Sequence, residues 1–286
     1  MTDTRVLIHK LGGKLSLPSL PTVVQEVQRA LRDPNSGMRD IARVLMADPP
    51  LAGRVLRIAN SAYYGLQVKV VDVSHAVTIL GQDTLQSIVL QIATERLFAN
   101  VQPCLDFKPS DLWAHSVLTA EVAGSAPASF YRGMHRAEVH STGLLHDIGS
   151  FVMFEHIREE FAACRKEARE RGLPDWEMEN RRFGFHHGHV GELIARRWSL
   201  PRLAVQAIAR HHDPKVAESE DTVVPWIAAA NHIAHHVVQG RRGAELAEPL
   251  PDCLDERLGL TGSPWLPELL ERSLELGDGH SGGRAA

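Results

Sequence analysis

Apolar residues recur along the N-terminal part of the chain with the three-to-four-residue spacing of amphipathic helices. Val23, Val27 and Leu31 begin the pattern, and Asp33-Pro34 ends this first predicted helix. Similar apolar stripes predict helices over residues 41–45, 51–58, 73–80 and 85–92, separated by the turn signals ADPP, ANSAYYG and Gly81. No stretch alternates apolar and polar residues over the length of a strand, so we expect no sheet of consequence.

The second half of the chain continues the helical spacing. Ser110 is the expected N-cap of a helix over DLWAHSVLTAEVAG. Further helices are predicted around residues 137–156, 159–171, 186–198, 201–212 and 223–238. Residues 239–264 are polar and rich in glycine and proline, which predicts mostly loop, and the last ten residues predict a frayed tail. The pattern therefore predicts an all-α protein built from two packed helical lobes.

Domain boundaries follow from the breaks in this pattern. We expect an extension over residues 1–14, an N-terminal helical lobe over 15–100 and a second lobe over 110–238. Residues 100–110, NVQPCLDFKPS, resemble a linker between the lobes. Residues 239–286 are expected to form a loop, a short helix and the tail. At 286 residues, the chain is long enough for one large helical domain or two smaller ones.

Composition narrows the class of protein. The chain contains no run of eighteen apolar residues and no secretory signal at its start, so we expect a cytoplasmic protein without a membrane. Its net charge of −4 gives no indication of a nucleic-acid surface. Cys104, Cys164 and Cys253 are far apart and form no CxxC pattern, so they are interpreted as reduced packing residues rather than disulfides or zinc ligands.

One apolar run, GLLHDIGSFVMF, contains two polar neighbours, His146 and Asp147. Burying such side chains is costly unless a partner satisfies them. A metal ion, a hydrogen-bond network or a buried ion pair could each do so, and the run itself does not decide between them.

Other potential metal ligands also lie on helices that carry apolar faces. They are His115, the His186-His187-His189 cluster, His211 with His212, and Asn231. Imidazoles and a carboxylate that converge from separate helices suit a divalent first-row metal. A histidine on an apolar helix face is more commonly a core residue held by hydrogen bonds, so spacing alone leaves both interpretations open. The pair His235-His236 is expected to face solvent.

The order of these motifs resembles the HD superfamily of metal-dependent phosphohydrolases and, more narrowly, its regulatory relatives, the HDOD family. The resemblance covers roughly residues 15–238 and rests on several blocks that occur in order. These are the segment from LPSLPTVV to NSAYYG, then VSHAVTILG, DLWAHS, LLHDIG, HGHVG and RRWSLPRLAVQAIARHHDP. The resemblance implies that the second lobe is an HD-like helical bundle.

The resemblance also implies a ligand set, position by position. A divalent ion, iron, manganese or zinc, would be held by side chains from this set: His115, His146, Asp147, His187, His211, His212 and Asn231.

Two positions depart from the pattern of the hydrolases. Asn231 stands where the closing aspartate is expected, and Ser150 stands where HD-GYP phosphodiesterases often carry a lysine; the GYP signature itself is absent. An amide is a weaker ligand than a carboxylate for hard cations, and a lost lysine is a lost cation beside a phosphoryl oxygen. Metal retention is therefore more compatible with these residues than efficient hydrolysis.

These features favour a bacterial-type signal-transduction protein that acts by protein contacts or by binding a small molecule, without efficient catalysis. The alternative is a metal-dependent phosphohydrolase acting on a nucleotide or a cyclic dinucleotide. Other signalling proteins are the expected partners, a nucleotide is a candidate ligand, and nucleic acid and membrane are not expected.

The N-terminal lobe carries one candidate signalling loop, within NSAYYG. Its residues are Asn60, Ser61, Tyr63, Tyr64 and Gly65, and the alternative interpretation is a helix stop with packed tyrosines. Asp48-Pro49 is interpreted as a helix terminator. Residues 38–60 can be drawn as a DNA-binding helix-turn-helix, but the apolar stripe on the second helix favours ordinary helix packing.

Overall fold

The computed structural model describes residues 20–60, 68–99, 101–131, 133–213, 215–238 and 250–271. Within these ranges every regular element is a helix, and β-type pairing is limited to one isolated bridge between Cys104 and Phe107. The all-α prediction is confirmed. Two compact units divide the chain: Ser19–Leu97 form one, and the chain from Phe98 onward forms most of the other. No described helix is long and apolar enough to cross a lipid bilayer.

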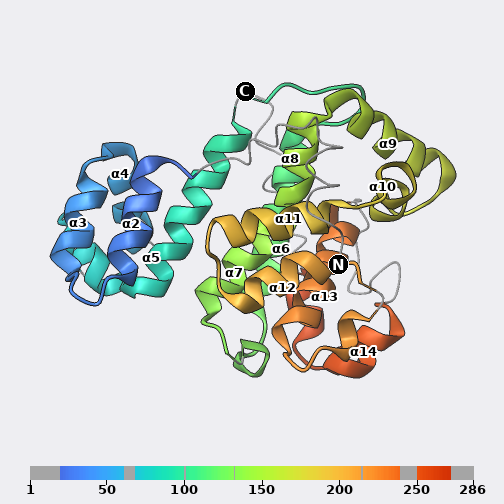
Figure 1. The fold of residues 1–286 in the computed structure, drawn as a ribbon. Coiled ribbons are helices and arrows are strands. Elements are labelled where there is room, and N and C mark those ends of the chain that lie inside the picture. The colour runs from blue at the N-terminus through green and yellow to red at the C-terminus, as the bar shows by residue number, and fades with distance from the viewer. Residues whose placement is uncertain are drawn as a thin grey trace. The chain divides into compact units, whose positions relative to one another are not determined.

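The first unit contains the helices that apolar spacing predicts. They are α2 (Thr22–Arg32), α3 (Met38–Met46), α4 (Pro49–Ala59) and α5 (Val73–Phe98), shown in blue to cyan in Figure 1. Gly81 interrupts α5 with a φ of 74°, a conformation that favours glycine, so the two predicted helices follow each other across a kink. Leu51 and Val55 of α4 are fully buried, which supports the packing interpretation of this helix.

Asp48 lies between α3 and α4 and fixes the start of α4. Its Oδ1 accepts a hydrogen bond from the Leu51 amide at 2.9 Å, and Pro49 occupies the first helical turn. Both carboxylate oxygens also accept from the Arg96 guanidinium, at 2.9 and 3.2 Å. The hydrogen bond from Arg96 lowers the pKa of Asp48 below its usual value of 3.8. Asp48-Pro49 is thus a helix boundary, and Asp48 also ties α4 to α5.

Replacing Asp48 with asparagine keeps an N-cap acceptor but removes the charge that pairs with Arg96. Because folding lowers the pKa of Asp48, the ion pair stabilises the folded state above pH 3.8 and this contribution disappears as the pH falls below that value. We expect Asp48→Asn to cost about 0.5 kcal/mol at pH 7, since a partly exposed pair is screened. Urea unfolding at pH 7 and pH 3 measures this difference. An equal difference at both pH values would contradict the assignment.

The second unit is a bundle that carries most of the chain's histidines. Its larger helices are α6 (Pro109–Ser125), α7 (Arg136–Leu145), α8 (Ile148–His156), α9 (Arg158–Arg171), α10 (Asp175–Phe183), α11 (His187–Arg197), α12 (Arg202–Arg210), α13 (Val223–Val238) and α14 (Asp252–Leu258). Short 3-10 turns lie at Ala128–Tyr131 and Val216–Glu218. Helix α11 packs against both α8 and α12, and α13 packs against α6 (Figure 1).

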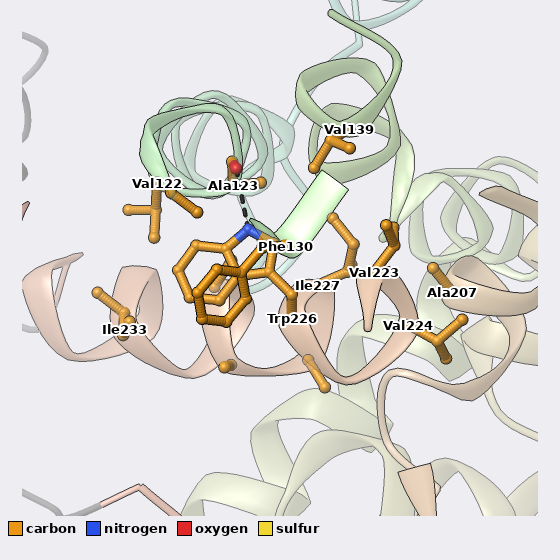
Figure 2. Packing of buried hydrophobic residues seen from close by; sticks show 14 of the residues in the cluster. Val122, Ala123, Phe130, Val139, Ala207, Val223, Val224, Trp226, Ile227 and Ile233 are labelled. Carbon is orange, nitrogen blue, oxygen red and sulfur yellow. Dashed lines mark hydrogen bonds between the residues drawn. The ribbon is translucent and has the colours of Figure 1, made fainter. Parts of the chain in front are cut away.

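Trp226 of α13 anchors the apolar core of this unit. Its ring is fully buried, and its Nε1 donates to the Ala123 carbonyl of α6 at 2.9 Å (Figure 2). The Phe130 ring lies beside it with centroids 5.2 Å apart. Leu254 of α14 belongs to the same buried cluster. The hydrogen bond between Trp226 and Ala123 joins α13 to α6, the helices that carry Asn231 and His115.

Several details of the second half differ from the sequence predictions. Helix α6 begins at Pro109, with Lys108 rather than Ser110 at the N-cap position. Residues 239–264 were predicted to be mostly loop, but Asp252–Leu258 within them form α14, and Leu254 of this helix packs into the core. His236 is buried rather than facing solvent, whereas His235 is exposed as expected. Cys164 is buried, but Cys253 is exposed and therefore is not a packing residue.

Candidate metal centre

His146 and Asp147 lie at the junction between α7 and α8. The sequence predicts one helix through residues 137–156, but α7 ends at Leu145 and α8 begins at Ile148. His146 is fully buried and Asp147 is 7% exposed. The apolar residues on either side belong to two helices, so the polar pair sits at a bend inside the unit.

Gly149 allows α8 to approach α11 closely enough to bring His187 to this junction. A Cβ atom on Gly149 would lie 1.9 Å from the His187 carbonyl oxygen and 2.7 Å from the Gly191 amide nitrogen. Both neighbours are backbone atoms that cannot rotate away. Only glycine fits this helix contact, and the contact sets the distance between Asp147 and His187.

Two groups of potential metal ligands meet at Asp147. The four-residue group contains Asp147, His187, His211 and His212, and the three-residue group contains His115, His146 and Asp147. Within each group, one donor atom from every residue lies within 4.8 Å of the others. The structure therefore brings together side chains that the sequence places on separate helices.

Backbone and carboxylate acceptors fix where three of these imidazoles carry their proton. Nδ1 of His146 donates to the Gly143 carbonyl at 2.7 Å, and Nδ1 of His211 donates to the Ile208 carbonyl at 2.8 Å. Nδ1 of His187 lies 2.7 Å from Oε2 of the buried side chain of Glu179. In its neutral form each of these imidazoles has a single N–H, so each Nε2 can then present a lone pair toward the centre.

Lone pairs face one another in the four-residue group. Nε2 of His187 lies 3.1 Å from Asp147 Oδ1 and 3.2 Å from Nε2 of His211, which lies 3.5 Å from the same oxygen. Asp147 Oδ1 is buried and has no hydrogen-bond partner among the described residues. Acceptor atoms this close repel unless a positive charge lies among them. A divalent cation, or a second proton on one imidazole, supplies it, and three imidazoles with a carboxylate are a set that fits a divalent metal.

The pKa values show how strongly this group attracts positive charge. Burial alone would lower the pKa of His187, but the Glu179 and Asp147 carboxylates raise it to about 10. Burial alone would raise the pKa of Asp147, but the neighbouring His146 and His187 hold it well below its usual value of 3.8. At neutral pH and without a metal, His187 therefore carries a second proton that pairs with the Asp147 carboxylate, and a bound divalent cation would replace that proton.

The three-residue group is arranged differently. His115 Nε2 lies 2.9 Å from Asn231 Oδ1 and 3.3 Å from His146 Nε2. Burial lowers the pKa of His115 to about 4 and that of His146 to about 3, so both rings are neutral at pH 7. An N–H on His115 Nε2 can donate to the Asn231 oxygen, and it also faces the lone pair of His146.

Comparison with known proteins identifies the family. The profile of the HDOD domain family matches residues 17–214. The chain belongs to the HDOD domain family. The resemblance derived from the sequence motifs is thereby confirmed, and so is the HD-like helical class of the fold.

Known relatives of this HDOD protein are similar over different lengths. An HDOD domain protein of unknown function from Geobacter sulfurreducens has a solved structure that is 26% identical, covers 99% of both chains and superposes with a TM-score of 0.71. An uncharacterized Treponema pallidum protein is 27% identical over 233 residues, which are 80% of this chain and 44% of that protein. Ribonuclease Y from Thermus thermophilus is 32% identical over 120 residues, 42% of this chain and 16% of the enzyme. The chain thus spans less than half the length of these two curated relatives.

Glu179 is the residue of the HDOD centre that sequence reasoning missed. It lies on α10, a helix that the apolar pattern did not predict, and it is fully buried. Its Oε2 accepts from both the backbone N–H and Nδ1 of His187, at 2.8 and 2.7 Å. The nearby Arg165 guanidinium pairs with Asp175 at 3.0 Å and lies 3.9 Å from Glu179 Oε1. A glutamate inside the charged stretch DWEMENRRF carries no sequence signal of burial.

The candidate signalling loop is described only at its first residue. Ser61, Tyr63, Tyr64 and Gly65 lie outside the described residues. The Asn60 side chain accepts from the Val70 N–H and donates to the Val70 carbonyl, both at 2.7 Å, and donates to the Leu56 carbonyl at 2.8 Å. Asn60 therefore joins the end of α4 to the segment that leads into α5.

Proposed function

We propose that this HDOD protein is a metal-binding signalling module that acts by contact with other proteins or by binding a small molecule, without efficient phosphodiester hydrolysis. The proposal rests on the difference between the two groups of ligands. In the four-residue group, imidazole Nε2 atoms surround a buried carboxylate oxygen. In the three-residue group, His115 contacts an amide, Asn231, where the hydrolases of the superfamily are expected to have an anion.

The contact between Asn231 and His115 is the observation that supports this proposal most strongly. Asn231 Oδ1 lies at hydrogen-bond distance, 2.9 Å, from His115 Nε2, the atom that would otherwise be available as a ligand. A neutral amide contributes no charge to offset a second cation. Ser150, at the position of the HD-GYP lysine, is fully buried, and its Oγ has no hydrogen-bond partner among the described residues. Neither residue supplies the electrostatic stabilisation that phosphoryl chemistry requires.

The metal in this proposal is divalent iron, manganese or zinc. Asp147, His187, His211 and His212 would hold it, all with atoms within 4.8 Å of one another. When bound, such an ion supplies a positive charge and a Lewis-acidic position for an anionic ligand. The residues of the chain would orient the ion, and Glu179 would hold the His187 ring. The expected partners are other signalling proteins, and a nucleotide is the candidate ligand.

Hydrolysis and metal content, measured together on the tag-free full chain, test this function. Bis(p-nitrophenyl) phosphate and a cyclic dinucleotide serve as substrates with added Mn²⁺. We expect bound metal but no turnover above a Mn²⁺-only control. The matched variant is Asn231→Asp, which restores the anion and should increase both the metal stoichiometry and the turnover.

Phosphohydrolase activity is the second candidate function. It is favoured by the two ligand groups that share Asp147, an arrangement suited to two-metal hydrolysis. Similarity to part of ribonuclease Y is compatible with it. Wild-type turnover that disappears in Asp147→Asn would establish this alternative and contradict the signalling proposal. Turnover that persists in Asp147→Asn would identify a contaminating enzyme and leave the signalling proposal standing.

A further inference from the structure

We infer that the two ligand groups are not equivalent: one divalent ion is held by the four-residue group, while the three-residue group is closed by hydrogen bonds and holds none. This inference rests on the proposed metal-binding function and assigns the ion to one side of Asp147. It also assigns Glu179 the role of a positioning residue, which acts on the ion through His187.

The three-residue group is satisfied without a cation. With an N–H on His115 Nε2, the proton donates to Asn231 Oδ1 at 2.9 Å and faces the lone pair of His146 Nε2 at 3.3 Å. His146 Nδ1 in turn donates to the Gly143 carbonyl. Donors and acceptors therefore match along these neutral groups, and the charge beside them is that of Asp147 Oδ2, 3.4 Å from His146 Nε2 and 3.8 Å from His115 Nε2.

The four-residue group lacks such a match. The Nδ1 protons of His187 and His211 are both directed outward, to Glu179 and to the Ile208 carbonyl. Their Nε2 atoms converge on Asp147 Oδ1, a buried oxygen without a hydrogen-bond partner among the described residues. A carboxylate oxygen between two imidazole Nε2 atoms requires a positive charge, which a proton on His187 supplies in the metal-free protein and a divalent cation would supply on binding.

Glu179 strengthens this preference. Its carboxylate receives two hydrogen bonds from His187, one from the backbone and one from Nδ1, and it is fully buried. A carboxylate on the far side of a ligating imidazole fixes the ring and makes Nε2 more basic. Nδ1 of His146 instead donates to the Gly143 carbonyl, which is a neutral acceptor. The Trp176 ring of α10 stacks at 20° on His212, with centroids 6.0 Å apart, so α10 also supports a second ligand of the same group.

Co²⁺ binding to the tag-free full chain tests the assignment, with calorimetry for affinity and visible absorption for the ligand environment. We expect one Co²⁺ per wild-type chain. His115→Ala should retain that ion with its Kd changed by less than about threefold, while His211→Ala should weaken it at least about 100-fold. Glu179→Gln preserves shape and an acceptor but removes the charge, so the Kd should rise by about 10- to 100-fold with the helical content unchanged. Asn231→Asp should admit a second Co²⁺.

The outcomes separate this inference from the proposed function. A wild type that binds no Co²⁺ contradicts both. One Co²⁺ that is lost in His115→Ala but kept in His211→Ala preserves metal binding and overturns the assignment. Unchanged Kd and absorption in Glu179→Gln overturn the positioning role, because a merely structural glutamate would leave both unchanged in this isosteric variant. If His211→Ala fails to fold, Glu179→Gln and Asn231→Asp still decide the question.

Discussion

Gly149→Ala is expected to destabilise the protein by at least about 3 kcal/mol and to abolish metal binding. The added methyl group would lie 1.9 Å from the His187 carbonyl oxygen, far inside van der Waals contact. The obstructing atoms belong to the backbone, so α8 and α11 must move apart. We therefore expect a loss of unfolding free energy at the upper end of the range usual for overpacking. The same movement would separate Asp147 from His187 and open the four-residue group.

Gly53→Ala is the matched control for this prediction. Gly53 lies inside α4, and a Cβ atom there would meet nothing within 4 Å. Alanine at such a position should stabilise its helix by up to about 1 kcal/mol. Urea midpoints of both variants, with Co²⁺ titrations of each, provide the comparison. A Gly149→Ala protein with wild-type stability and affinity would show that the contact between α8 and α11 does not set the geometry of the centre.

Asp147→Asn is expected to remove metal binding altogether, with a loss of affinity of at least about 100-fold. Asp147 belongs to both ligand groups and contributes their one carboxylate. The amide would leave only neutral imidazoles around the ion, and a loss at a direct ligand should exceed the 10- to 100-fold effect of a residue behind it. Without metal the variant should still fold, because the amide keeps the size of the side chain and the buried Glu179 still pairs with His187.

Thermal unfolding with and without metal measures this effect. A ligand at 100 times its Kd stabilises the folded state by about 2.7 kcal/mol, so the wild-type Tm should rise with added Co²⁺. The Tm of Asp147→Asn should not change. Asp106→Asn is the control, since Asp106 is 65% exposed and pairs with Arg169 at the surface. A metal-dependent Tm in Asp147→Asn would show that Asp147 is not a ligand.

The helices of this protein were predictable where one apolar stripe belongs to one helix. α2, α4 and α11 are of this kind. The prediction was wrong where apolar residues continue through a bend, as at His146-Asp147, because spacing alone cannot separate two consecutive buried helices. It also missed α10, whose sequence DWEMENRRF is mostly polar and has few apolar positions to show a period.

The candidate ligands could be selected from residue type and motif order, but their chemistry could not. The proton positions on His146 and His211 depend on the Gly143 and Ile208 carbonyls, and backbone acceptors leave no trace in the side-chain sequence. Glu179 lies on an unpredicted helix and becomes relevant only because the fold brings it to His187. The sequence left open whether His146 and Asp147 hold a metal or a hydrogen-bond network, and the structure supports a different answer on each side of Asp147.

Anomalous X-ray diffraction from crystals grown with Mn²⁺ or Zn²⁺ tests whether the four-residue group holds the ion, because it locates the ion without assuming which residues bind it. Data collected on both sides of the absorption edge should show one peak per chain, bounded by Asp147, His187, His211 and His212. A peak only between His115 and His146, or no peak near Asp147 at a metal concentration that saturates binding in solution, would contradict the account.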